Sequence, residues 1–172
     1  DSSGILPDGD YIVWYEVSDN DNECVLTNEQ NNERMLILRN GPYDEDAYML
    51  NFQHVSGDTY YVTDERGYYL EIGAGSSNFT SGEKTVEITW VENPGCWRIK
   101  QNGQWLNQHG GRHVTQAGGY SVYDDAGNNL IITKKLDSPE DAYTYQLAEK
   151  TQDKQPENMN WIYNVGSVPE ID

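Results

Sequence analysis

Short runs of β-branched and aromatic residues recur along the chain and alternate with polar turns. The clearest stretch is residues 85–106, with the sequence TVEITWVENPGCWRIKQNGQWL. Two apolar runs in it flank Asn93-Pro94-Gly95, and a third follows Asn102-Gly103. Proline fixes φ and glycine accepts a positive φ, so both residue types interrupt a strand ladder. The pattern therefore predicts three strands joined by tight turns.

Similar runs predict strands on both sides of this stretch. Residues 120–133 predict a hairpin around Asp125-Ala126-Gly127, and the small, polar residues 73–82 are typical of a loop. The run 142–150 follows a helix-start pattern, but aromatic and polar residues alternate in it, so we expect a strand. The other expected strands occupy residues 10–17, 24–27, 35–38, 47–55, 59–63, 68–72 and 159–165.

Two pairs of segments show internal similarity. Residues 59–72 align with residues 96–108 when one residue is skipped, and residues 36–52 align with residues 130–147. About twelve short strands with threefold similarity predict an all-β fold, the β-trefoil, in a single domain of residues 1–172. The alternatives are an eight-stranded barrel of the lipocalin type, for which the expected strands are too many, and a β-sandwich.

Several short motifs are spread over most of the chain. The start contains Asp1-Ser2-Ser3-Gly4, Leu6, Gly9 and Tyr11-Ile12-Val13, and a later run reads Asn22-Glu23-Cys24-Val25-Leu26-Thr27. In mid-chain Val91, Pro94, Trp97 and Ile99 are spaced as V-x-x-P-x-x-W-x-I, and Gly110-Gly111 precedes YSVYDDAGNNLIIT. Together these motifs resemble the Kunitz-type (soybean trypsin inhibitor-like) β-trefoils. The resemblance implies a β-trefoil that inhibits a protease.

The resemblance also implies a reactive loop, formed by Gly41, Pro42, Tyr43, Asp44, Glu45 and Asp46. Classical members present Ser-Pro-aromatic-Arg/Lys there, whereas this chain has Gly41-Pro42-Tyr43-Asp44. The buried carboxylate of a trypsin pocket would repel an acid at the specificity position. We therefore expect an inhibitory loop that is not directed at trypsin, and the alternative is a turn that Pro42 merely shapes.

The cysteines depart from that family. Its members commonly carry a second disulfide near the C-terminus, but this chain has no cysteine after Cys96. Two cysteines in a polar, lysine-poor chain fit one disulfide, Cys24–Cys96, in an oxidising compartment, with two buried thiols as the alternative. We accordingly expect a secreted protein. Asn78-Phe79-Thr80 also matches the N-glycosylation acceptor pattern.

The motif Trp105-Leu106-Asn107-Gln108 resembles the aromatic-Leu strand of ricin-type β-trefoil lectins, although their usual Gln-x-Trp signature is missing. In that interpretation Trp105 stacks on a sugar, while Asn107 and Gln108 bond the sugar hydroxyls. The alternative places Trp105 in the core. A carbohydrate-binding lectin is therefore the second functional hypothesis, with a glycan as partner in place of a protease.

The formal net charge of −18 excludes two classes of partner. Nucleic acids and anionic membrane surfaces both require a positive face on the protein, so we expect neither. The three histidines, His54, His109 and His113, form no zinc pattern, because Gly110-Gly111 separates the closer two. No catalytic motif is present, so we expect a non-enzymatic binding protein with no metal and no cofactor.

Overall fold

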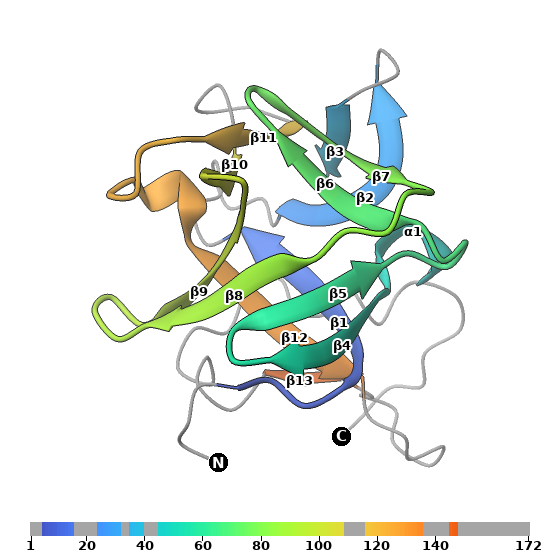
Figure 1. Ribbon diagram of the computed structural model, residues 1–172, viewed down its shortest axis with the longest axis horizontal. Helices are drawn as coiled ribbons and strands as arrows, with labels where there is room; N and C mark the ends of the chain where they lie inside the picture. Colours follow the sequence, from blue (N-terminus) through green and yellow to red (C-terminus); the bar gives the residue numbers. More distant parts are fainter. Residues whose placement is uncertain are drawn as a thin grey trace, which may run out of the picture.

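The structure is a computed structural model that describes residues 5–15, 24–31, 35–39, 45–108, 116–135 and 145–147 (Figure 1). The described residues form thirteen strands, one single-turn helix and one 3-10 turn. In chain order these are β1 (Gly9–Tyr15), β2 (Cys24–Asn31), β3 (Met35–Arg39), α1 (Glu45–Tyr48), β4 (Leu50–Ser56), β5 (Thr59–Thr63), β6 (Tyr69–Gly73), β7 (Ser76–Thr80), β8 (Val86–Val91), β9 (Cys96–Gln101), β10 (Gln104–Gln108), β11 (Gln116–Tyr120), η1 (Ala126–Asn128), β12 (Leu130–Lys135) and β13 (Tyr145–Leu147). No helix in this part of the chain is long and apolar enough to cross a membrane.

Six of the strands close into a barrel. Going round the ring, β1 pairs with β4, β4 with β5, β5 with β8, β8 with β9, β9 with β12, and β12 with β1. Every one of these pairings is antiparallel. Closure matters because an open sheet would leave a row of unpaired backbone groups at each edge.

Three hairpins are attached to this barrel, one in each third of the chain. β2–β3 extends from β1, β6–β7 extends from β5, and β10–β11 extends from β9. Each third therefore consists of a barrel strand, a two-strand hairpin and a second barrel strand. This arrangement is a β-trefoil, which confirms the expected fold class. β13 is an additional strand that pairs with β12.

The threefold arrangement is visible in the buried side chains. The first barrel strand of each third carries an inward aromatic residue followed two positions later by a β-branched one, because side chains alternate between the two faces of a strand. The first strand of each hairpin contributes a buried leucine. These residues are Tyr11 and Val13, Tyr60 and Val62, Trp97 and Ile99, and then Leu26, Leu70 and Leu106.

Only one of the two internal sequence alignments joins segments that form equivalent strands. Residues 59–72 and 96–108 both form a barrel strand followed by the first strand of a hairpin, so that alignment is confirmed. Residues 36–52 and 130–147 do not correspond, because β3 belongs to a hairpin whereas β12 is a barrel strand. The second alignment matched two similar apolar runs that have different roles in the fold.

Two local expectations are also wrong. Residues 76–80 form β7 instead of a loop, and two of its side chains, Ser77 and Phe79, are buried. Residues 120–133 do not form a hairpin, because Tyr120 ends β11, which pairs with β10, whereas β12 pairs with β1. The nine residues between them, 121–129, form a loop that contains η1.

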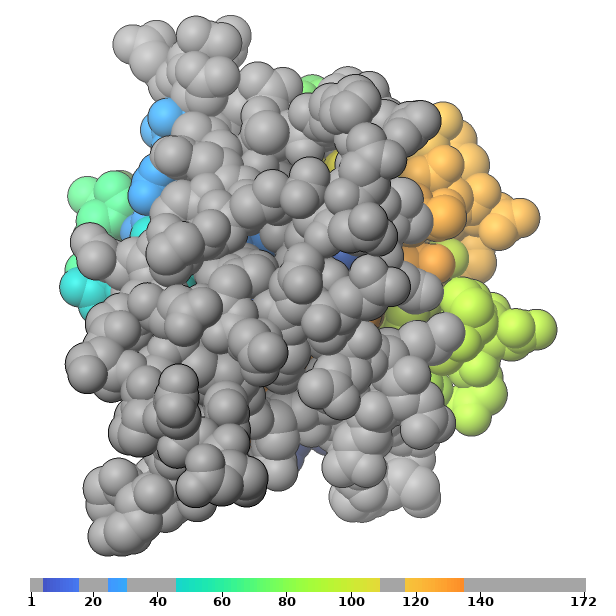
Figure 2. All heavy atoms as spheres, turned by 180° about the vertical axis from the view of Figure 1, so that it is seen from behind, coloured from blue at the N-terminus to red at the C-terminus, as the bar shows by residue number. Residues whose placement is uncertain are grey.

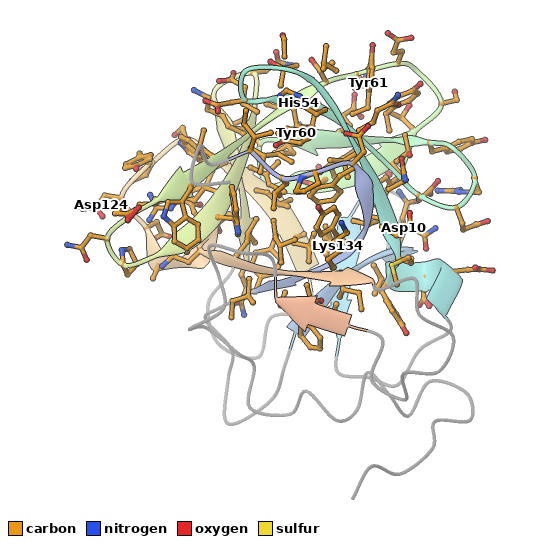
Figure 3. All side chains as sticks on the ribbon, turned by 90° about the horizontal axis from the view of Figure 1, so that it is seen from below. Asp10, His54, Tyr60, Tyr61, Asp124 and Lys134 are labelled. Carbon is orange, nitrogen blue, oxygen red and sulfur yellow. The ribbon has the colours of Figure 1, made fainter. Side chains whose placement is uncertain are left out.

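Tyr60 fastens the segment before β1 to the barrel. Its hydroxyl accepts a hydrogen bond from the Leu6 backbone N–H at 2.6 Å and donates one to the Leu6 carbonyl at 3.2 Å. The ring also meets His54 edge-on, with centroids 5.1 Å apart (Figure 3). Burial raises the pKa of Tyr60 above its ordinary value, and burial raises the pKa of Tyr11 in the same way.

The backbones of the second and third hairpins are in close contact, and the residues at the contact are glycines. The Gly75 N–H donates to the Gly119 carbonyl at 3.0 Å. A Cβ on Gly119 would lie 2.5 Å from the carbonyl oxygen of Gly73, and one on Gly118 would lie 2.8 Å from the carbonyl carbon of Gly75. The obstructing atoms are backbone, so a larger residue could not be accommodated by a simple rotamer change.

We expect Gly119→Ala to lower the free energy of unfolding by about 1–3 kcal/mol, the usual cost of overpacking a close contact. Gly82→Ala is the matched control, since a Cβ there would meet only the Nζ of Lys84 at 3.7 Å. Urea unfolding monitored by tryptophan fluorescence measures both. Equal stability of the two variants would show that the hairpins are not closely packed at this point.

Stability should fall at alkaline pH. A tyrosine with a raised folded-state pKa contributes stability that is complete below its unfolded pKa of about 10 and is lost as the pH rises towards the folded value. Tyr60→Phe should lower the free energy of unfolding at pH 7 by about 1–3 kcal/mol, because two Leu6 backbone groups lose their partner. The same variant should show a shallower decline in urea titrations above pH 10. If the free energy of unfolding of Tyr60→Phe falls above pH 10 as steeply as that of the wild type, Tyr60 is not a cause of the alkaline loss of stability.

Candidate functional site

A polar and aromatic site lies on the outer side of β9 and β10, under the loop 121–129. Trp97 and Ile99 of β9 point into the core, so the alternating Arg98 and Lys100 point outwards. Arg98 is nevertheless only 4% exposed. It is covered because its guanidinium bonds to the loop at Tyr123 and at Asn129.

Asp125 connects the loop to β10. Its Oδ2 accepts hydrogen bonds from the Gly127 backbone N–H at 3.0 Å and from Asn107 Nδ2 at 2.9 Å. Asn107 Nδ2 also donates to Asn128 Oδ1 at 2.8 Å. A Cβ on Gly127 would lie 2.8 Å from both Asn107 Nδ2 and Asp125 Oδ2, so only glycine leaves room for this bond.

The backbone carbonyl of Tyr123 is held by three donors. It accepts from Arg98 Nη1 at 2.9 Å, from Asn128 Nδ2 at 3.0 Å and from the Asp125 backbone N–H at 3.0 Å. The guanidinium carbon of Arg98 also lies 4.5 Å from the centroid of the Tyr123 ring. The main chain at Tyr123 is therefore firmly anchored.

The side chain of Tyr123 is by contrast 51% exposed. Its ring meets Trp105 edge-to-face, with centroids 5.2 Å apart. Tyr120, which is 37% exposed, lies opposite Trp105 on the neighbouring strand. We call Trp105, Tyr120, Val122 and Tyr123 the aromatic surface.

The figures place the loop 121–129 at one edge of the molecule. In Figure 1 the loop with η1 lies on the same side as the β8–β9 turn. Figure 2, from behind, shows the same two segments along one edge, in orange and yellow-green. Asp124, labelled in Figure 3, lies at the outer edge, far from Asp10. The surface is therefore reached from outside the barrel.

Charges of both signs surround the rings. Lys100 Nζ lies 5.2 Å from the Trp105 centroid and 4.0 Å from the carboxylate of Glu87, and both side chains are partly exposed. Asp124 is exposed and Asp125 is half-buried. Within the described residues, no group of three or more potential metal ligands occurs. The site therefore offers rings, carboxylates and one ammonium group, without a metal cluster.

This combination suits a ligand that has an apolar face and several hydroxyls. An exposed aromatic ring provides a flat apolar surface, and carboxylate and amide oxygens accept hydrogen bonds from hydroxyl groups. A few fixed polar groups beside apolar surface are typical of small-molecule sites.

The structure separates the three residues of the expected sugar-binding motif. Trp105 is partly exposed and belongs to the aromatic surface. Asn107 is only 4% exposed and lies behind that surface, bonded to Asp125 and Asn128. Gln108 is 7% exposed and sits opposite Ala117, so it is not part of the outer surface.

Sequence reasoning missed Arg98, Tyr123, Asp125 and Asn128. The available signal was Asp125-Ala126-Gly127-Asn128, in which an aspartate two residues before a glycine is typical of a turn closed by its own side chain. Arg98 had no local signal, because its partners lie 25 and 31 residues further along the chain.

The expected inhibitory loop and glycosylation site stay predictions. Residues 41–44 of the expected inhibitory loop lie outside the described residues, while Glu45 and Asp46 begin α1. Asn78 lies within β7, opposite Glu71, and its glycosylation stays a prediction.

The expected disulfide finds no support. Cys96 is buried and its thiol donates to Asn129 Oδ1 at 3.3 Å. No disulfide is seen among the side chains that the structure describes, and the side chain of Cys24 lies outside them. The Cys24–Cys96 pair therefore stays a prediction.

Comparisons with known proteins support the fold. No protein-family model matches the chain, and no curated protein matches it in sequence. Among solved structures, the chain is similar to the Polyporus squamosus lectin bound to the human-type influenza-binding epitope Neu5Acα2-6Galβ1-4GlcNAc, with a TM-score of 0.62 and 16% identity. The similarity covers 76% of this chain and 50% of the lectin chain, so the chain spans half of the lectin's length.

A second similar structure is the designed threefold-symmetric protein ThreeFoil, with a TM-score of 0.55 and 11% identity over 72% of this chain and 97% of that one. At these identities the similarity shows the fold alone. Both neighbours are β-trefoils, one natural and one designed, and the resemblance to Kunitz-type inhibitors finds no support among them.

Proposed function

We propose that this protein binds carbohydrate at the aromatic surface, without catalysing a reaction. The observation that carries the proposal is the half-exposed Tyr123 ring, which is held against Trp105. The same loop carries Asp125, whose carboxylate is fixed by Asn107 and Gly127. A sugar would place its C–H face on the Tyr123 ring and direct its hydroxyls to the polar groups behind the ring.

The exposure of the aromatic surface supports the proposal. Large apolar side chains that gather on a surface mark binding sites more often than isolated ones do. Tyr120, Val122 and Tyr123 are all exposed and follow one another closely along the chain. Water contact with these side chains would be lost on ligand binding, and this loss favours binding.

The polar groups support it as well. Both described hydrogen bonds to Asp125 use Oδ2, so Oδ1 is available to accept a hydroxyl. Because Asn107 and Gly127 fix the carboxylate, little conformational entropy is lost when it binds.

The fold comparison agrees with this proposal, because one structural neighbour is a lectin bound to a sialylated glycan. Protease inhibition, our first expectation from the sequence, has no comparable support, since its candidate loop lies mostly outside the described residues. Secretion stays a prediction.

The experiment is a glycan array that contains both Galβ1-4GlcNAc and its Neu5Acα2-6 form, run beside a panel of serine, cysteine and aspartic proteases. We expect glycan binding and no inhibition. Tyr123→Ala should weaken binding by at least about tenfold, the usual loss when a central aromatic contact is truncated.

Tyr61→Ala is the matched control, because Tyr61 forms a similar edge-to-face pair with Tyr69 on other strands, with centroids 5.6 Å apart. It should bind as the wild type does. Protease inhibition without glycan binding would reject the proposed function. Equal binding by both variants would reject the aromatic surface as the site.

A further inference from the structure

We propose that Arg98 is a positioning residue, which holds the Tyr123 ring in its binding orientation from beneath; this inference rests on the proposed function. The guanidinium reaches the loop at two points. Nη1 bonds to the Tyr123 carbonyl at 2.9 Å, while Nε and Nη2 bond to Asn129 Oδ1 at 3.1 and 2.8 Å. Arg98 thus bridges the two halves of the loop 121–129 and ties both to β9.

Arg98 is buried, although it carries a charge. A buried guanidinium normally has a carboxylate partner, because removing a charge from water is costly. Among the described residues no carboxylate forms an ion pair with Arg98, and its hydrogen-bond acceptors are a backbone carbonyl and an amide. A hydrophobic side chain in its place would leave Asn129 Oδ1 and the Tyr123 carbonyl without the donors that Arg98 supplies. A hydrophobic side chain also lacks the planar guanidinium, whose donors reach two points of the loop at once.

Arg66 shows what an arginine with a structural role looks like in the same chain. Its guanidinium lies 4.2 Å from the Tyr68 centroid, much as Arg98 lies by Tyr123. Unlike Arg98, it forms an ion pair with the Asp64 carboxylate at 2.7 Å, and its side chain is 44% exposed. Arg66 lies in the turn between β5 and β6, whereas the aromatic surface belongs to β10, β11 and the loop 121–129.

Positioning has a definite consequence for binding. Tyr123 is half-exposed, and an exposed side chain that is ordered only when a ligand arrives adds an entropic cost to binding. Arg98 fixes the carbonyl of Tyr123 and one face of its ring, while Trp105 contacts the ring edge-to-face. The remaining ring surface stays open, so the ligand meets a ring that is already oriented. Losing this preorganisation should weaken binding about threefold to tenfold.

The test compares Arg98→Met, which keeps the length but lacks charge and donors, with Arg98→Lys, which keeps the charge but lacks the fork. Arg66→Met is the control. Binding of all four proteins is titrated on the array described above, and folding is checked by thermal unfolding. We expect affinity to decrease from wild type to Arg98→Lys to Arg98→Met, with Arg66→Met equal to wild type. The near-UV circular dichroism spectrum, to which the Trp105–Tyr123 pair contributes, should change in both Arg98 variants and stay unchanged in Arg66→Met.

Four results would overturn the inference. The first is an unchanged affinity in both Arg98 variants. The second is an equal loss in Arg98→Met and Arg66→Met, which would mean a general effect on stability. If Arg98→Met does not fold, the test uses Arg98→Lys alone. The third result is then a wild-type affinity in Arg98→Lys. If the wild type binds no glycan, the proposed function fails, and the near-UV spectrum still tests Arg98. A spectrum that is unchanged in both Arg98 variants is the fourth result and would overturn its positioning role.

Discussion

Closure of the six-stranded barrel is the constraint on which the remaining structure depends. The ring joins strands from the beginning, middle and end of the chain, and a single bridge, between Trp97 and Leu130, connects β9 to β12. Both side chains are buried in the core. Because the barrel is closed, the hairpins and loops attached to it are presented from a rigid base, which is the usual way in which folds support binding sites.

The candidate site shows how such a base can carry an asymmetric feature. In the second third of the chain, residues 81–85 connect the hairpin to the next barrel strand, whereas residues 121–129 make the equivalent connection in the third. The longer connection brings Tyr123 and Asp125 over β9 and β10. Buried polar contacts from Arg98, Asn107 and Asn128 then hold that loop, and buried networks of this kind are stable only when their members are paired. The site thus comes from one loop and its supports, on strands whose barrel positions are shared by all three repeats.

The sequence predicted the fold because its strongest signals are local. Aromatic and β-branched residues two apart, such as Tyr60 and Val62 or Trp97 and Ile99, mark barrel strands directly. β7 was missed because its outward side chains are small and polar, and only Ser77 and Phe79 face inwards. The hairpin expected at 120–133 was wrong because β11 already forms a hairpin with β10, while β12 pairs with β1, which is distant in sequence. The support of Tyr123 by Arg98 could not be predicted for the same reason, whereas Trp105 was found because it lies in a recognisable motif.

The glycine contact between the second and third hairpins has an evolutionary consequence. Repeated folds diversify when each repeat can accept mutations independently of the others. Here the backbones at Gly118 and Gly119 touch the turn at Gly73 and Gly75, so a side chain gained on one hairpin must be matched by a changed turn on the other. These two hairpins are therefore expected to diverge together, as one inherited unit.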